Sequence, residues 1–217
     1  MQAKKMQTLY KSELRNKYRI EVMEKHIPKP SKNRFVYLEH DEIANPIKTV
    51  NDFFNAAWLP EQLKMLKDWR NHAAFETVKS KNHNPANLLY DHELTIKLVE
   101  AAWLLKGNRL GRIDVDKTKE LHFTQWFIKT ERKKFRDYPK HLSVKEILNP
   151  SSVIKQMFKI HKLNSYRRIL DTWLYEALNT KFMEDSLSKS EVIIVYEQLV
   201  RLFEAMWLIS ERIKLKP

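Results

Sequence analysis

Basic side chains are concentrated in one stretch of this sequence, between residues 129 and 140. Its six cations stand beside four aromatic residues, and lysine and arginine neutralise the phosphates of nucleic acids. This density favours a nucleic-acid-binding surface, and the alternative is an ordinary solvated face whose aromatic residues belong to the core. The cations are Lys129, Arg132, Lys133, Lys134, Arg136 and Lys140, and the aromatic residues are Trp126, Phe127, Phe135 and Tyr138.

A second basic group follows on the next predicted helix. Lys155, Lys159 and Lys162 recur at intervals of three or four residues, so they share one helical face that can follow a phosphate backbone. Arg167 and Arg168 complete the set that we predict to contact nucleic acid.

The net charge of +13 is unevenly distributed along the 217 residues. Residues 1–35 carry a balance of +7 and residues 129–168 a balance of +9, whereas the remainder is slightly acidic. Such asymmetry favours an anionic partner. Nucleic acid is the first candidate partner, and an acidic protein or a second copy of the chain is the alternative.

The pattern Glu-x3-Lys/Arg-x2-Glu occurs twice and could hold a pair of metal ions. Helical sites of that kind usually add a Glu-x-x-His element, and none of the eight histidines has a glutamate three residues earlier. We therefore expect no metal site, but a solvated stripe whose opposite charges face one another at helical spacing. The residues are Glu93, Lys97, Glu100, Glu197, Arg201 and Glu204.

Other catalytic motifs are missing. Without cysteine and with only two glycines, the sequence has no thiolate chemistry, phosphate-binding glycine loop or dinucleotide fingerprint. The spacing Arg-x4–6-His, which some helical ribonucleases use, occurs at Arg19/His26, Arg34/His40 and Arg136/His141. The sequence favours a non-enzymatic nucleic-acid-binding or regulatory protein without a cofactor. A protein-interaction scaffold or homodimer is the alternative, and a metal-independent helical ribonuclease is a third.

The elements that must position these residues are repeated. Sliding the sequence on itself by 104 positions aligns residues 38–107 with residues 142–211 without a gap and gives 16 identities. Average composition would give roughly four or five by chance. The matches include Trp69 with Trp173 and Trp103 with Trp207. We expect all four tryptophans in the core, because they recur among apolar neighbours.

The two glycines also argue against sheet folds, whose turns require left-handed backbone. We predict an all-α protein in which a four-helix unit is duplicated, giving two tandem bundles that pack as one pseudo-two-fold body. The units are predicted to span residues 1–112 and 113–217. No long apolar run or secretion-type N-terminus is present, which predicts a soluble cytoplasmic protein without a membrane partner.

Helix boundaries are predicted from prolines, caps and periodicity. Asn45-Pro46 and Asn149-Pro150 are predicted to begin helices, each asparagine accepting a backbone N–H bond worth on the order of 1 kcal/mol. Ser143 and Glu146 fit a capping box, and Gly107 a C-terminal cap. The predicted helices span residues 5–26, 46–57, 60–78, 87–106, 121–135, 150–161, 164–183 and 189–213, with a loop at 79–85 and a hairpin across 112–127 as the alternative to the fifth.

Overall fold

The structure, a computed structural model, describes residues 35–74, 84–113, 120–179 and 188–215. Within these ranges every regular element is a helix, which confirms the predicted all-α class. None of these helices is both long enough and apolar enough to cross a bilayer. The helices are α2 (His40–Ala44), α3 (Pro46–Ala56), α4 (Leu59–Ala74), α5 (Pro85–Leu105), α6 (Glu120–Lys134), α7 (Val144–Leu148), α8 (Ser151–Ile160), α9 (Leu163–Leu178) and α10 (Lys189–Lys214).

Most predicted boundaries agree with these helices. The α6 helix confirms the helix predicted at 121–135, and the described part of 112–127 contains no hairpin. The α9 helix ends at Leu178, earlier than predicted, and Pro85 opens α5 instead of closing a loop. The helix predicted over residues 5–26 lies outside the described residues.

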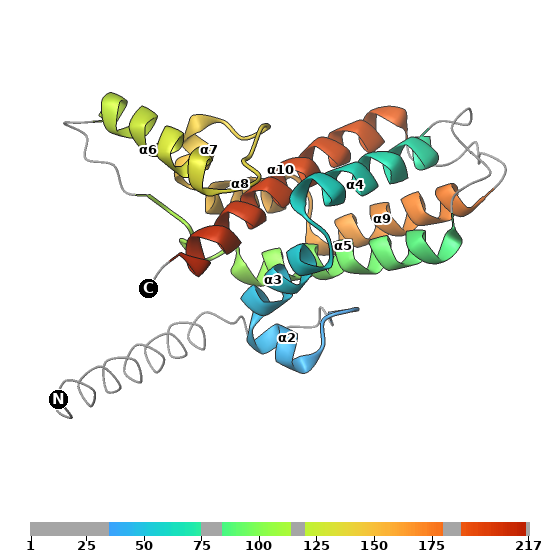
Figure 1. The fold of residues 1–217 in the computed structure, drawn as a ribbon. Helices are drawn as coiled ribbons and strands as arrows, with labels where there is room; N and C mark the ends of the chain where they lie inside the picture. Colours follow the sequence, from blue (N-terminus) through green and yellow to red (C-terminus); the bar gives the residue numbers. More distant parts are fainter. Residues whose placement is uncertain (1–34, 75–83, 114–119, 180–187, 216–217) are drawn as a thin grey trace.

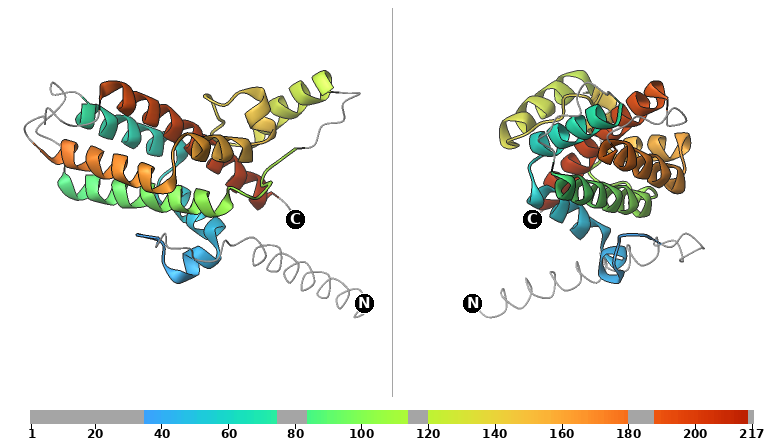
Figure 2. Two further views of the ribbon diagram at one scale, coloured as in Figure 1. Left: turned by 180° about the vertical axis from the view of Figure 1, so that it is seen from behind. Right: turned by 90° about the vertical axis from the view of Figure 1, so that its right-hand side faces the viewer.

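Four long helices form the centre of the molecule, with α4 beside α10 and α5 beside α9 (Figure 1; end-on in Figure 2). Helices α4, α9 and α10 therefore pack chiefly on helices from the other half of the sequence, whereas α5 packs on α9 and about equally on α3. Both halves contribute to one core. At its centre α4 meets α9, where Trp69 and Trp173 stand edge to face with ring centroids 5.6 Å apart. Both are only 1% exposed. The predicted division near residue 112 stays a prediction.

The second pair of tryptophans joins the shorter helices to this core. Trp207 on α10 packs against Phe54 on α3, and Trp103 on α5 packs against Phe158 on α8. Trp207 is buried and Trp103 is partly buried, with the Lys106 ammonium 3.1 Å from the centre of its ring. The prediction that the tryptophans belong to the core is confirmed for Trp69, Trp173 and Trp207, whereas Trp103 packs against the core at its edge.

The predicted solvated stripe is wrong for its two terminal glutamates, because Glu100 and Glu204 are 0% and 1% exposed. Glu100 accepts the backbone N–H groups of Val36, Tyr37 and Leu38 at 2.9–3.3 Å. The segment before α2 crosses α5 at Glu100, and its backbone N–H groups face the helix. Backbone N–H groups that are removed from water need an acceptor, which the Glu100 carboxylate provides. The spacing of charges along one helix cannot predict a contact with a distant segment of the chain. Among the described residues, no three histidine, aspartate or glutamate side chains gather as a metal site.

The Asn-Pro cap prediction is also wrong. Neither Asn45 nor Asn149 uses its side chain as a helix cap. Asn45 ends α2 and Asn149 ends α7, with backbone ψ angles of 72° and 74°. A side chain that caps a helix needs extended backbone, which directs it toward the N–H groups of the first turn, and these two residues do not have it. By contrast, the predicted capping box of Ser143 and Glu146 is confirmed. Gly107 follows the cap residue Lys106 and is not left-handed.

These caps generate a prediction. Replacing Ser143 with alanine removes the hydroxyl that accepts the Glu146 N–H and donates to its carboxylate. We expect a loss of about 1 kcal/mol in the free energy of unfolding, measured by urea denaturation. Asn45→Ala, the matched control without a cap bond, should cost less than about 0.5 kcal/mol. Equal losses would contradict these assignments.

Candidate nucleic-acid interface

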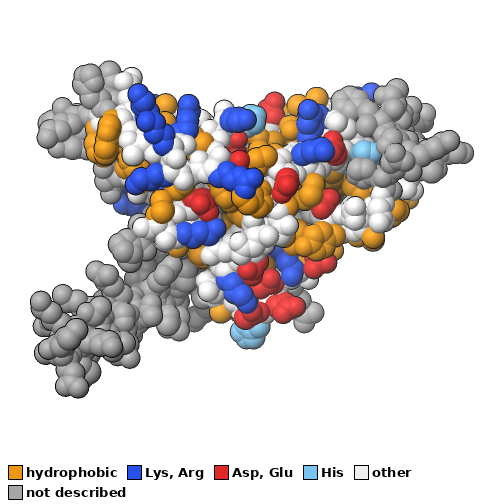
Figure 3. Space-filling view, in the orientation of Figure 1, with side chains coloured by type: hydrophobic (Ala, Val, Ile, Leu, Met, Phe, Trp, Pro, Cys, Tyr) orange, Lys and Arg blue, Asp and Glu red, His pale blue; other side chains and the backbone are white. Residues whose placement is uncertain are grey.

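The α6 helix lies at one end of the molecule, beside the C-terminal part of α10 (Figure 1). Its inner face, with Thr124, Ile128 and Glu131, continues into Phe135 and is buried or partly buried toward α10. Its outer face carries exposed cations that continue into the following loop, and we call this set the α6 basic face. Its members are Lys129, Arg132, Lys133, Lys134, Arg136 and Lys140, all of them exposed. Blue side chains are dense over this end of the molecule in Figure 3.

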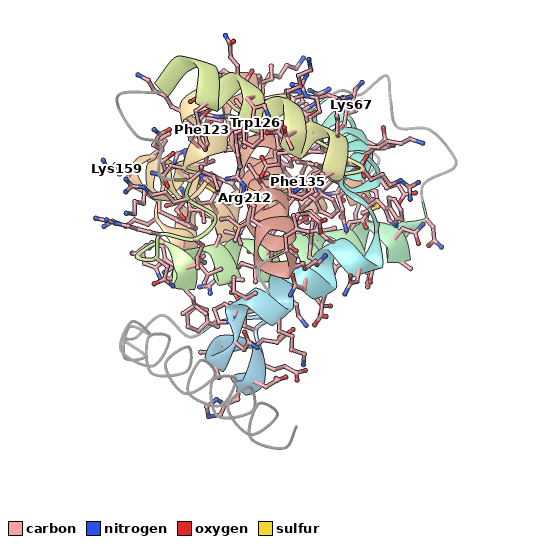
Figure 4. The ribbon with its side chains drawn as sticks, turned by 60° about the vertical axis from the view of Figure 1, so that its left-hand side comes forward. Lys67, Phe123, Trp126, Phe135, Lys159 and Arg212 are labelled. Atoms are coloured by element: carbon pink, nitrogen blue, oxygen red, sulfur yellow. The ribbon has the colours of Figure 1, made fainter. Side chains whose placement is uncertain are left out.

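The structure separates the second predicted group from this face. Lys155 and Lys159 lie on α8, Lys162 directly precedes α9, and Arg168 lies on α9; all four are exposed. In Figure 4, Lys159 projects from the side of the molecule, away from α6. Arg167 is instead buried, where its guanidinium holds the Glu100 carboxylate and donates to Asn164 Oδ1 at 2.8 Å. Unlike the other four, it is therefore already engaged in bonds inside the fold.

A buried ion pair anchors α6 to the body. Arg212 on α10 donates from Nε and Nη2 to the two carboxylate oxygens of Glu131, at 2.7 Å each. Its Nη1 donates to the carbonyl oxygens of Gly111 and Ile147 at 2.5 and 2.7 Å. One guanidinium thus joins α6, α7, α10 and the turn after α5. Sequence reasoning missed this pair, whose members lie 81 residues apart.

The turn at Gly111 is specific to glycine. Its φ of +64° is left-handed, and a Cβ there would lie 3.1–3.3 Å from Pro150 and Ile209. This close approach places its carbonyl oxygen against Arg212.

The loop after α6 is equally fixed. The buried Glu204 carboxylate accepts hydrogen bonds from the backbone N–H groups of Lys140 and His141 at 2.8 and 2.7 Å. The side-chain Nδ1 of His141 lies 2.8 Å from Oε1 of the same carboxylate. The Trp207 indole donates to the Asp137 carbonyl at 2.8 Å. The backbone that carries Arg136 and Lys140 is therefore held in place before any ligand binds.

In the part of the chain that the structure describes, carboxylates do not neutralise the α6 basic face. Within the described ranges, none of its six side chains forms an ion pair. The nearby acids face inward: Glu131 holds Arg212, Glu204 holds the loop backbone, and Asp137 has its Oδ2 buried. The cations therefore produce a positive electrostatic potential at the surface of the protein.

Aromatic rings orient both arginines of the face. The Arg136 guanidinium carbon lies 3.0 Å from the centre of the Trp58 ring, which is 42% exposed. The Arg132 guanidinium carbon lies 5.3 Å from the centre of the Tyr138 ring. Burial raises the pKa of Tyr138, and its hydroxyl donates to Glu131. Sequence reasoning counted the cations but did not foresee that Trp58, more than seventy residues away, supports one of them.

The described Arg/His pair does not have the arrangement that the ribonuclease hypothesis requires. Of the three Arg/His pairs, only Arg136 and His141 lie wholly within the described residues. Their side chains have separate partners, since Arg136 stacks on Trp58 and His141 bonds to Glu204. The structure does not bring them together on a common helix, because α6 ends at Lys134.

A cavity of about 300 Å³ lies between α3, α4 and α5. Its polar lining residues are Gln62, Asp68, Asn87, Tyr90 and Asp91, and the remainder are apolar. Burial raises the pKa of Asp91 to about 6. Its ionisable side chains are the two aspartates and Tyr90, and the lining contains no histidine or lysine.

Comparison with known protein families, with curated proteins and with solved structures found no match for this chain. The geometry of the chain therefore carries the functional argument alone.

The anchor of α6 yields a stability prediction. Arg212→Leu leaves the Glu131 carboxylate buried without its cation, and we expect this to cost about 3–5 kcal/mol of unfolding free energy. Arg132→Leu, one residue along α6 from Glu131 but exposed, should cost less than about 0.5 kcal/mol. Adding Glu131→Leu to Arg212→Leu should restore much of the loss. Chemical denaturation measures all three variants, and a mild effect of Arg212→Leu alone would contradict the anchoring role.

Proposed function

We propose that this chain is a non-enzymatic protein that binds nucleic acid through the α6 basic face. One observation carries the proposal: six exposed cations stand on a fixed segment, and none of them is neutralised by a carboxylate within the described residues. Surface lysines and arginines usually stand among acids of opposite sign. A face beside which Glu131 and Glu204 are engaged in buried bonds is suited to a polyanion.

The spacing of the cations supports this proposal. Arg132 and Lys133 follow Lys129 by three and four residues, so these three lie on one side of α6, and Arg136 follows in the loop after the helix. A row of cations matches the regular charge of a phosphate backbone better than it matches a single anion. Because the buried bonds of Arg212 and Glu204 already hold the row, binding requires little ordering of the backbone.

We also propose that the architecture is an internal duplication with a pseudo-two-fold axis between Trp69 and Trp173. Helices α4 and α9, and α5 and α10, begin 104 residues apart. Contacts repeat at the same offset: Glu100 accepts from Val36 as Glu204 does from Lys140. The ring contacts Phe54–Trp207 and Trp103–Phe158 exchange partners between the halves, as a two-fold relation requires.

A second function, self-association, is favoured by a different observation. Leu89 and Tyr90 on α5 are exposed, and so are Ile193 and Ile194 at the equivalent turn of α10. Adjacent exposed apolar side chains at matching positions are typical of an interaction surface. Association through apolar contacts would respond little to salt, whereas phosphate binding weakens steeply as salt rises.

Salt dependence tests the proposed function. If the cations of α6 contact phosphates, log affinity should decline against log salt by roughly 0.7–0.9 for each contact. The double variant Lys133→Gln/Lys134→Gln should flatten this slope by about 1.5 and weaken all sequences alike. The measurement is a mobility-shift titration with DNA and with RNA at several salt concentrations.

The matched control is Lys64→Gln/Lys67→Gln, which removes the same charge from exposed lysines of α4. The control should leave the slope unchanged. If neither DNA nor RNA binds at low salt, nucleic-acid binding is wrong and the self-association function takes its place.

A further inference from the structure

One aromatic side chain on α6 stands where folding gives it no role. Trp126 is 60% exposed, whereas Trp69, Trp173 and Trp207 are buried. The inner face of the helix contains Thr124, Ile128 and Glu131, so Trp126 lies outside the packed side. Leaving a large aromatic surface in water forgoes the stabilisation that its burial would give.

Trp126 lies in line with the cations. Lys129 follows it by three residues and Lys133 by seven, so all three project from one side of α6. Its ring is supported by Phe123, whose centroid is 5.9 Å away at an interplanar angle of 43°. Phe123 in turn stacks on Phe127 at 6.2 Å. Figure 4 shows Phe123 and Trp126 together on α6, above Arg212 and Phe135.

A second flat group, the guanidinium of Arg136, lies beyond the C-terminal end of α6. The Arg136 guanidinium lies 3.0 Å over the exposed Trp58 ring and is therefore held in a fixed orientation. Bases of unpaired strands stack on aromatic rings and on guanidinium planes, and cations between such groups bind the phosphates. Duplex bases are stacked within the helix and cannot use such platforms without being flipped out.

From this juxtaposition we propose that the α6 basic face binds single-stranded nucleic acid, with one base stacked on Trp126 and the neighbouring phosphates on Lys129 and Lys133. This inference rests on the proposed function and adds to it the class of ligand. The phosphate contacts supply the salt-dependent attraction, and Trp126 supplies the preference for unpaired strands.

The test uses fluorescence anisotropy of a labelled oligothymidylate of about 12 nucleotides, within the range that single-strand sites cover. An abasic strand of equal length and a duplex with an equal number of phosphates serve as comparisons. The full chain should bind oligothymidylate more tightly than either comparison. Trp126→Ala should weaken oligothymidylate binding by about 5- to 150-fold, the range for one stacked base, and should change the other two affinities little.

Further variants separate stacking from a structural effect. Trp126→Phe should retain most of the affinity, because a smaller ring still stacks. The salt slope of Trp126→Ala should equal that of the wild type, since no phosphate contact is lost. Tyr175→Ala, which removes a similarly exposed aromatic side chain from α9, should have no effect. Thermal unfolding should be nearly unchanged in Trp126→Ala, because the side chain is exposed.

The failures of the two proposals are distinguishable. If the wild type binds duplex and abasic strand as tightly as oligothymidylate, and Trp126→Ala changes none of them, the single-strand inference is overturned while nucleic-acid binding stands. If none of the three ligands binds at low salt, both are overturned.

Discussion

Two buried carboxylates, those of Glu100 and Glu204, constrain how the rest of the molecule is arranged. Each lies on a long central helix and accepts backbone N–H bonds from a distant segment of the chain. Removing a carboxylate from water costs several kcal/mol unless its oxygens accept hydrogen bonds. Each segment therefore has to remain against its helix, because its N–H groups supply those bonds. Arg167 completes the bonding of Glu100 from α9 in the other half of the sequence.

This constraint extends to the candidate interface. The segment held by Glu204 carries Lys140, and it continues from Arg136, which rests on Trp58. The bidentate pair of Glu131 and Arg212 fixes α6 itself. The buried acids of this region serve internal bonds, and the cations above them keep their charge toward solvent. The same bonding therefore fixes the basic face and, among the residues that the structure describes, leaves it without acidic partners.

How far the sequence predicts this molecule depends on the range of the interaction. Local signals, such as helix periodicity, the capping box of Ser143 and the apolar surroundings of Trp69, correctly predicted the helices and the core. The Glu100 carboxylate was misassigned to a solvated stripe, because Lys97 stands at helical spacing while the true donors lie more than sixty residues earlier. Arg167 was counted with the surface cations for the same reason. At the interface, the sequence identified the cations but missed Arg212 and Trp58, which long-range packing alone brings to them.

Photo-crosslinking tests most directly whether the fixed basic face is where nucleic acid binds. A single-stranded oligonucleotide with a photoreactive base is irradiated with the full chain at low salt, and the adducts are mapped by mass spectrometry. Within the residues that the structure describes, we predict adducts between Phe123 and Lys140, with Trp126 the principal site. Adducts found mainly on α5 or α9, or none in the segment from Phe123 to Lys140 although the strand binds, would contradict this account.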